Sequence, residues 1–179
     1  MSPFATKRSD TLHLMEGAGR EVVMLRIIAC ISKNNALGKA NKLLYNIPED
    51  MNRFKKLTTG HTIIMGRRTY ESLPHGALPN RRNIVLSRTI REYEGCEVYS
   101  SLNEALKHCK GDVYIIGGAS VYHEAMTKCD ELLLTIVDDI YPDADTFFPD
   151  YTEWKLAGKE EHKKSESNSH AFAFCKYIK

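Results

Sequence analysis

The sequence predicts a single α/β domain, built as a mostly parallel sheet with flanking helices. Two observations predict this class. Several short apolar runs are continuous rather than alternating, as expected for strands that are buried on both faces. Segments with helix start and stop signals stand between these runs, and such alternation is typical of α/β folds. The length of 179 residues also matches one domain, which usually has about 100–200 residues.

The predicted core strands are short, bounded by turn signals, and in several cases rich in Ile and Val. Runs of this length suit a parallel sheet that is covered by helices. They are Leu25–Ile31, Thr62–Met65, Asn83–Leu86, Val113–Ile116 and Leu132–Val137.

Three segments between the apolar runs are predicted helices. Pro48–Thr59 has proline in its first turn and Gly60 just beyond its end, which is the usual asymmetry of helix ends. Leu102–Cys109 follows Ser100–Ser101, and serine side chains are good N-caps. Ser120–Lys128 follows a pair of glycines.

The end of the chain has a different pattern. Trp154–Glu161 and His170–Ile178 are separated by the polar loop Lys163–Ser169, and Phe172 and Phe174 are spaced with a period of two. A period of two is typical of a strand. We therefore expect an antiparallel C-terminal hairpin that closes one edge of the sheet.

The composition excludes several classes of protein. Hydrophobic residues make up 42% and charged residues 27% of the chain, as in globular proteins and unlike collagens or disordered chains. The net charge of +2 provides no field for nucleic acid or anionic lipid. No apolar run approaches the roughly 20 residues that span a bilayer. The five cysteines form no CxxC pair, so we expect no structural zinc and a reducing cytoplasm.

Residues 1–23 are unlike the rest of the chain. Their charges balance, and they contain neither the apolar core of a secretory signal nor the acid-poor composition of a mitochondrial transit peptide. We expect a loosely ordered extension, or an upstream start codon, with the domain running from Met24 to Lys179.

Three strand ends carry residues suited to phosphate. Gly66–Thr69, Ser87–Thr89 and Gly117–Ser120 each follow a predicted strand, and ligands of open α/β sheets bind beyond the carboxyl ends of the strands. Glycine allows close backbone approach and arginine supplies a fork of donors. Taken alone, a glycine pair after a strand is more often a plain turn, and an arginine pair is more often a solvated face; three such junctions at strand ends together favour phosphate binding. The chain has neither GxGxxG nor GxxxxGK[ST], and two arginine-bearing junctions favour NADP over NAD.

Asp50 is an acid on an apolar helix face. Phe54 and Leu57 follow it at i+4 and i+7, so the three side chains share one side of the predicted helix. The simpler interpretation is favourable interaction with the helix dipole. If the carboxyl lies in a cleft, desolvation raises its pKa toward neutrality, and it could hold an amidine-like ring through two oxygens. The neighbouring Glu49 points about 100° away and is expected in solvent.

A series of ordered segments resembles bacterial dihydrofolate reductase from about Met24 to the C-terminus. The Met-Gly-Arg-x-Thr-x-Glu-Ser run is the most specific part. The matching segments are Ile27–Cys30, Leu37–Gly38, Ile47–Met51, Thr62–Leu73, Leu78–Asn83, Ile116–Gly118, Leu134–Thr135 and Asp145–Pro149.

The resemblance implies an eight-stranded sheet and an oxidoreductase that reduces 7,8-dihydrofolate to 5,6,7,8-tetrahydrofolate. Hydride from NADPH would go to C6 and a proton to N5, in support of one-carbon, thymidylate and purine metabolism. It also implies a cytoplasmic monomer and antifolate target, without metal, nucleic acid or membrane partners.

The resemblance assigns roles near the reacting atoms to four residues. Asp50 matches the single pterin-binding carboxylate, and Thr135 matches the threonine that bonds to this acid and to the ring amino group. Tyr122 would lie beside the region of hydride transfer. The lid Asn34–Tyr45 usually ends in Pro-Trp, whose tryptophan orders a water near the pterin; this chain has Leu44 and Tyr45 there, so Tyr45 is expected to take that role.

The resemblance also implies two binding sets. Arg81 would grip the α-carboxylate of the glutamate tail. The predicted substrate-binding residues are Ile28, Cys30, Asp50, Phe54, Leu73, Arg81, Ile116 and Thr135. The predicted cofactor-binding residues are Cys30, Leu37, Gly38, Gly66, Arg67, Arg68, Thr69, Leu86, Ser87, Arg88, Ile116, Gly117, Gly118, Ala119, Ser120, Val121 and Tyr122.

Two alternatives stay open at the level of sequence. One is the related reductase of riboflavin synthesis, which shares the NADPH junctions but is not expected to combine Asp50, Phe54 and Arg81. The other is a degenerate homologue that binds pterin or nucleotide without catalysis, for which Tyr45 is the only supporting feature.

Overall fold

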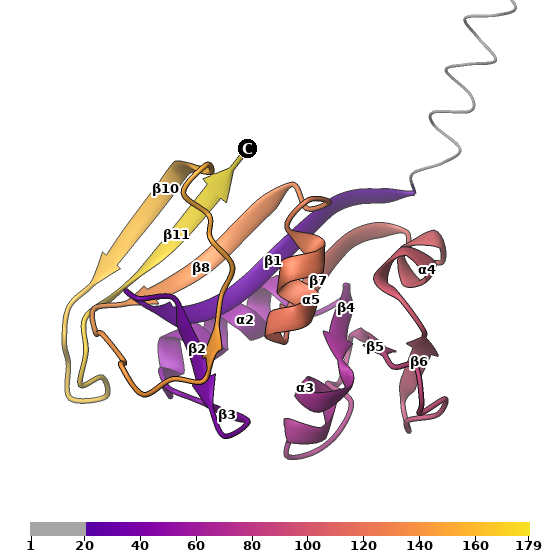
Figure 1. The fold of residues 1–179 in the computed structure, drawn as a ribbon. Helices are drawn as coiled ribbons and strands as arrows, with labels where there is room; N and C mark the ends of the chain where they lie inside the picture. The colour runs from indigo at the N-terminus through magenta and orange to yellow at the C-terminus, as the bar shows by residue number, and fades with distance from the viewer. Residues whose placement is uncertain (1–20) are drawn as a thin grey trace, which may run out of the picture.

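The computed structural model describes residues 21–179, and Figure 1 traces their fold. The predicted extension, residues 1–23, therefore falls almost wholly outside the described residues. The first strand, β1 (Val22–Ser32), begins slightly upstream of the expected domain start at Met24.

The centre of the molecule is one eight-stranded sheet with the order β10-β11-β8-β1-β7-β4-β5-β6. All neighbours from β8 to β6 are parallel, whereas β11 is antiparallel to both β8 and β10. The predicted mostly parallel sheet and C-terminal hairpin are thus confirmed. The strands after β1 are β4 (Thr62–Gly66), β5 (Arg82–Leu86), β6 (Cys96–Tyr99), β7 (Gly111–Gly117), β8 (Glu131–Val137), β10 (Lys155–His162) and β11 (Phe172–Ile178).

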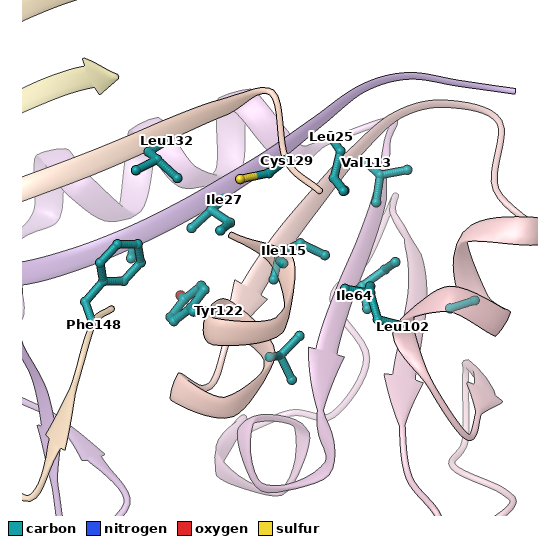
Figure 2. Packing of buried hydrophobic residues seen from close by; sticks show 14 of the residues in the cluster. Leu25, Ile27, Ile64, Leu102, Val113, Ile115, Tyr122, Cys129, Leu132 and Phe148 are labelled. Carbon is teal, nitrogen blue, oxygen red and sulfur yellow. The ribbon is translucent and has the colours of Figure 1, made fainter. Parts of the chain in front are cut away.

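Alternate residues of β1 enter two different cores, because successive side chains of a strand point to opposite faces. Ile27 and Ile31 pack with α4 (Leu102–Lys107) and α5 (Ala119–Ala125). Figure 2 shows Ile27, Ile115 and Tyr122 from this cluster. Ile28 packs on the other face with Phe54 of α2 (Pro48–Thr58). In Figure 1, α5 accordingly covers the near face of the sheet and α2 lies behind it.

The helices form where their end signals predicted, but they end sooner. The Ser101 hydroxyl accepts a hydrogen bond from the Glu104 N–H at 3.1 Å and caps α4 as expected. The sequence predicted that α4 would reach Cys109, yet the N–H groups of His108 and Cys109 bond three residues back. Such bonds tighten the last turn into 3₁₀ geometry, which ends the α-helix at Lys107.

Several short elements were not predicted. A second, three-stranded sheet has the order β3-β2-β9, and a short helix, α3 (Arg67–Ser72), follows β4. The strands of this small sheet are β2 (Ala36–Lys39), β3 (Lys42–Leu43) and β9 (Thr146–Phe147). The segment predicted as a lid thus contains β2 and β3.

No helix within residues 21–179 combines the length and the apolar character that crossing a bilayer requires.

Candidate active site

Asp50 is held against the middle of the sheet by a hydrogen bond. It lies in the first turn of α2, two residues after Pro48. The Thr135 hydroxyl of β8 donates to its Oδ1 at 2.5 Å. No other protein hydrogen bond to this carboxylate occurs among the described residues, so Oδ2 retains its acceptor capacity. The carboxylate therefore has one oxygen fixed by the fold and one available to a donor on a ligand.

Opposing effects act on the acidity of Asp50. Burial raises the pKa of its carboxyl, whereas the Thr135 hydrogen bond and the charge of Arg53 lower it; burial prevails, so the pKa is higher than usual. This direction agrees with the expectation for an acid in a cleft.

A second polar position lies farther along α2. The Arg81 guanidinium donates through Nη1 to the Thr58 hydroxyl at 3.1 Å. Its Cζ also lies 5.9 Å from the ring centroid of Phe54. At 1.5 Å rise per residue, Asp50 and Thr58 are about 12 Å apart along the helix. The face of α2 thus offers a carboxylate, an aromatic ring and a guanidinium in order.

The apolar residues predicted to surround the substrate lie in the cluster beneath α2. Buried Ile28 packs there with the partly buried Phe54, Leu73 and Ile116. Cys30 lies close enough to Asp50 that the carboxylate, after burial, contributes to raising the pKa of its thiol. The structure therefore brings this predicted set to one face of the sheet.

Tyr122 approaches the same strand from the other helical layer. It is buried in α5, and its hydroxyl donates to the Ile28 carbonyl at 2.8 Å. Burial, with smaller contributions from Cys30 and Asp50, raises its pKa. The phenol is therefore a neutral donor that is already engaged with the backbone.

Tyr45 has a partner that the sequence did not suggest. Its hydroxyl donates to Asp139 Oδ2 at 2.8 Å, and its ring meets the edge of His170 at 5.7 Å. These side chains line a cavity of about 220 Å³ with Ile47. Burial and Asp139 both raise the pKa of the phenol. The hydroxyl is thus bound to Asp139 rather than to Asp50.

Two of the predicted phosphate junctions meet at Thr69. The peptide between Gly117 and Gly118 is cis, and Gly117 has φ of +135°. A Cβ built on either glycine would lie 3.3 Å from the Thr69 hydroxyl oxygen. Gly66 likewise faces Val121, at 3.2 Å from a built Cβ. Small residues are thus needed where the β4–α3 and β7–α5 junctions touch.

The third junction lies beside the first. Gly66 and Leu86 are register partners at the ends of the parallel strands β4 and β5, so the residues that follow emerge side by side. The Ser87 hydroxyl accepts backbone N–H groups from Thr89 and Ile90, at 3.3 and 3.0 Å.

The arginines of these junctions are accessible. Arg68 and Arg88 are exposed, and Arg67 lies 3.6 Å from Glu71 in an i,i+4 pair. The three arginines therefore follow the ends of the neighbouring strands β4 and β5, with side chains open to solvent.

The remaining predicted cofactor residues lie around these junctions and on the small sheet. Leu37 is buried in the cluster on the α5 side, and Gly38 follows it in β2. Ala119, Ser120 and Val121 form the first turn of α5.

Arg53 is the site residue that sequence reasoning missed. It follows Asp50 by three positions on α2, which puts both on one helix face. Its Cζ lies 4.4 Å from the ring centroid of Phe174, and its Nη1 is buried without a hydrogen-bond partner among the described residues. Asp50 therefore has a charged neighbour on its own helix; the i+3 spacing was the available signal.

Among residues 21–179, no group of three or more His, Cys, Asp or Glu side chains is arranged to hold a metal ion.

Comparison with known proteins gives a consistent result. The sequence profile of the family described as Dihydrofolate reductase matches residues 24–179. The chain is 39% identical over 161 residues to the dihydrofolate reductase of Bacillus subtilis, covering 87% of this chain and 95% of that one. It is 40% identical over 164 residues to that of Neisseria meningitidis, covering 88% and 99%. The solved dihydrofolate reductase from Enterococcus faecalis, complexed with NADP(H) and RAB-propyl, superposes with a TM-score of 0.80 at 31% identity, covering 87% and 95%.

Proposed function

The chain belongs to the dihydrofolate reductase family, and on that premise we propose that it reduces 7,8-dihydrofolate to 5,6,7,8-tetrahydrofolate with NADPH. A hydride goes to C6, a proton goes to N5, and NADP⁺ leaves. The observation that carries this proposal is the pairing of Asp50 with Thr135 at one end of α2 and Arg81 with Thr58 at the other. This spacing suits a ligand with a pterin-like ring at one end and a carboxylate at the other.

Asp50 is proposed to bind and orient the ring. Its free Oδ2 can accept from a ring N–H or amino group, while Thr135 keeps the carboxylate in one position. A hydrogen-bonded anion in a partly buried site stabilises positive charge on the ring, and so favours protonation of N5. Ile28 and Phe54 would exclude water from the ring faces.

Arg81 is proposed to bind the substrate carboxylate. It is fixed by Thr58 and by the Pro79 carbonyl, at 3.1 and 3.0 Å, and arginine pairs with carboxylates in a planar, bidentate manner. Holding both ends of the substrate lowers the entropic cost of bringing the reacting carbons together.

The residues at the strand ends fit NADPH. Gly117 and Gly118 carry no side chain between their backbone and Thr69, where an added Cβ would lie 3.3 Å from its hydroxyl oxygen, and glycine backbone allows close approach of a phosphate. The exposed Arg68 and Arg88 have no carboxylate partner among the described residues. These residues, with Arg67, Thr69 and Ser87, are proposed to hold the phosphates. When bound, the cofactor supplies the hydride.

The test is loss of NADPH absorbance with dihydrofolate, compared between wild type and Asp50→Asn. We expect Asp50→Asn to slow turnover strongly near neutral pH while NADPH affinity, followed by fluorescence, stays nearly unchanged. Glu49→Gln is the matched control, because it makes the same acid-to-amide change one residue away. An equal loss of cofactor affinity in Asp50→Asn would contradict the assignment.

The same assay separates the alternatives. Binding of both ligands without turnover would indicate a non-catalytic homologue. Oxidation of NADPH only with a ribosylamino-uracil would indicate the riboflavin-pathway reductase.

We also propose that residues 24–179 form the catalytic unit and that the protein acts as a cytoplasmic monomer. The five free thiols of the described chain suit a reducing compartment. Light scattering on the purified chain tests the oligomeric state.

A further inference from the structure

A row of register partners crosses four strands beneath α2. Cys30 of β1 pairs with Thr135 of β8, Thr135 pairs with Phe174 of β11, and Phe174 pairs with Glu160 of β10. Side chains of directly opposed residues point to the same face of a sheet. The row therefore places a thiol, a hydroxyl, an aromatic ring and a carboxylate side by side on one face, with Glu160 at its solvent-exposed end.

Two charged residues of α2 contact adjacent positions of this row. Asp50 accepts the hydroxyl of Thr135. One turn later, Arg53 lies with its guanidinium 4.4 Å from the ring centroid of Phe174. One helical turn separates Asp50 from Arg53, and this distance is close to that between the neighbouring strands β8 and β11. Each charged side chain therefore has its own contact on the sheet, and the two are held as neighbours.

The guanidinium of Arg53 has no ionic partner of its own. Among the described residues it makes neither a hydrogen bond nor an ion pair, and its Nη1 is buried and unsatisfied. A buried donor without a partner is uncommon in native proteins. The aromatic ring compensates part of the desolvation by cation–π attraction. Its charge is therefore available to act through space.

We propose that Arg53 is a positioning residue that keeps Asp50 ionised, so that a bound ring meets a carboxylate anion at neutral pH. Arg53 acts through Asp50, and Phe174 holds it within range. The catalytic consequence rests on the proposed function, whereas the effect on the carboxylate does not.

The other groups near Asp50 carry no charge at neutral pH, so Arg53 is its charged neighbour. Cys30 from β1 and Tyr122 from α5 have pKa values raised by burial and stay neutral at physiological pH. Thr135 from β8 does not titrate. Burial raises the pKa of Asp50 itself, and Arg53 acts in the opposite direction together with Thr135.

Arg53 itself is influenced by burial and by three neighbouring side chains. Burial lowers its pKa, while Asp50, Glu160 from β10 and Cys175 from β11 favour its charged form. Glu160 Oε1 accepts a hydrogen bond from Nε2 of the His162 ring at 2.9 Å, and its side chain lies toward solvent. Arg53 thus stands between an inner and an outer carboxylate.

The first test is a carbon-detected NMR titration of the Asp50 carboxyl in wild type and Arg53→Met, with Asp50→Asn identifying the signal. Removing a nearby positive charge raises the pKa of a carboxyl, and we expect the midpoint to rise by about one pH unit. Arg53→Lys should restore most of the wild-type midpoint, because it restores the charge. It also provides a soluble variant if Arg53→Met does not fold.

Lys56→Met is the matched control, since it removes the same charge from an exposed position of the same helix. We expect the Lys56→Met midpoint to equal that of wild type. An Arg53→Met midpoint indistinguishable from that of Lys56→Met would overturn the proposal.

The second test is the pH dependence of dihydrofolate reduction. The limb that reports Asp50 should move to higher pH in Arg53→Met by the same amount as the NMR midpoint, with the KM for NADPH unchanged. A shifted carboxyl with an unshifted rate profile would overturn the catalytic part. If wild type does not reduce dihydrofolate, the proposed function fails, and the titration still decides the role of Arg53.

Discussion

At the scale of single residues, Asp50 is expected to make stability depend on pH. Burial raises the pKa of its carboxyl in the folded state, so the folded protein binds this proton more tightly than the unfolded chain. The stability that the protonated Asp50 carboxyl contributes is therefore fully present below the pKa of the unfolded chain, about 3.9, and is lost as pH rises through the pKa of the folded state. Each pH unit between these two values costs about 1.4 kcal/mol at neutral pH.

Asp50→Asn removes this titration. We expect the variant to be at least as stable as wild type at neutral pH and to lack the decline above about pH 4 that Asp50 causes. Urea denaturation at a series of pH values measures both. A variant markedly less stable than wild type at neutral pH would contradict a raised pKa and would indicate that the ionised acid stabilises the fold.

Tyr45 tests how far a family role transfers to a substituted residue. Its hydroxyl is bound to Asp139, so we expect Tyr45→Phe to cost about 1 kcal/mol of stability, as for a typical hydrogen bond. Turnover should change by no more than a few-fold, because the lost hydroxyl does not contact Asp50. Chemical denaturation and steady-state assays check the two parts. A loss of kcat of a hundredfold or more would instead support the water-ordering role.

At the scale of elements, Arg26 ties three parallel strands together. From β1 it donates through Nε to Glu131 of β8 at 2.8 Å, and through Nη1 to Asp112 of β7 at 3.0 Å. Lys176 of β11 adds a contact of 3.0 Å to Glu131. The side chains of Arg26 and Glu131 are only 18% and 12% exposed. Removing one partner therefore leaves a charge that water cannot fully solvate.

We expect Arg26→Met to lower the free energy of unfolding by about 2–3 kcal/mol at neutral pH. Lys33→Met is the matched control, because Lys33 pairs with Asp138 where both side chains are more than half exposed, and such pairs contribute less than about 1 kcal/mol. Urea titrations compare the two. Equal losses would show that burial does not strengthen the Arg26 network.

The Arg26 network should also weaken in acid. Burial raises the pKa of Glu131, but the hydrogen bonds from Arg26 and Lys176 outweigh it and hold the value below the usual range. Stability from this acid is thus present above the unfolded carboxyl pKa and is lost as pH falls through the folded one.

The elements that the sequence predicted are those with a strong local signal. Continuous apolar runs revealed the central strands, and a capping serine revealed α4. By contrast, β6 has four half-buried residues without alternation, and β2 and β9 pair Ala36 with Phe147 across more than a hundred residues. Pairing between residues this far apart produces no hydrophobic periodicity in either segment, so neither secondary-structure propensity nor hydrophobic pattern predicts these strands.

The site divides in the same way. Strand-end logic predicted the glycine and arginine junctions, and helix spacing predicted Asp50 with Phe54. The bond from Thr135 was expected only from the family resemblance, because it joins residues 85 positions apart. The contact between Tyr45 and Asp139 spans 94 positions, and no motif predicted it. The i+3 spacing of Arg53 from Asp50 indicates that the two share a helix face. Arg53 was not predicted because the pattern used to define that face was made of apolar residues, and Arg53 is charged.

At the scale of the whole molecule, strand order brings the junctions together. Neighbouring β7, β4 and β5 are parallel, so their carboxyl ends reach the same edge of the sheet, where α3 and α5 begin (Figure 1). α2 covers the face behind this sheet. One edge thus supplies predicted phosphate ligands while the covered face supplies the predicted ring site. At the end of β7, Ile116 belongs to the cluster beneath α2 and the next residue, Gly117, packs beside Thr69 of the phosphate junctions.

This arrangement predicts discrimination between cofactors. The 2′-phosphate is the only difference between NADPH and NADH. Arg68 and Arg88 come from the two arginine-bearing junctions that favour NADP and are exposed, so of the proposed phosphate-binding residues we expect these two to bind it. Each charged hydrogen bond contributes about 1.5–3 kcal/mol, so we expect Arg68→Met and Arg88→Met each to weaken NADPH binding by about 10- to 100-fold. NADH binding should stay unchanged.

The measurement is the rise in unfolding free energy with each dinucleotide, because a ligand at 100 times its Kd adds about 2.7 kcal/mol. Arg91→Met is the control, since Arg91 is exposed three residues beyond Arg88 and is not a predicted ligand. Arg68→Met and Arg88→Met should need more NADPH than wild type for the same stabilisation, whereas Arg91→Met should need the same amount. NADH should stabilise wild type and the three variants equally. Weaker stabilisation by both dinucleotides would place the 2′-phosphate elsewhere on this edge.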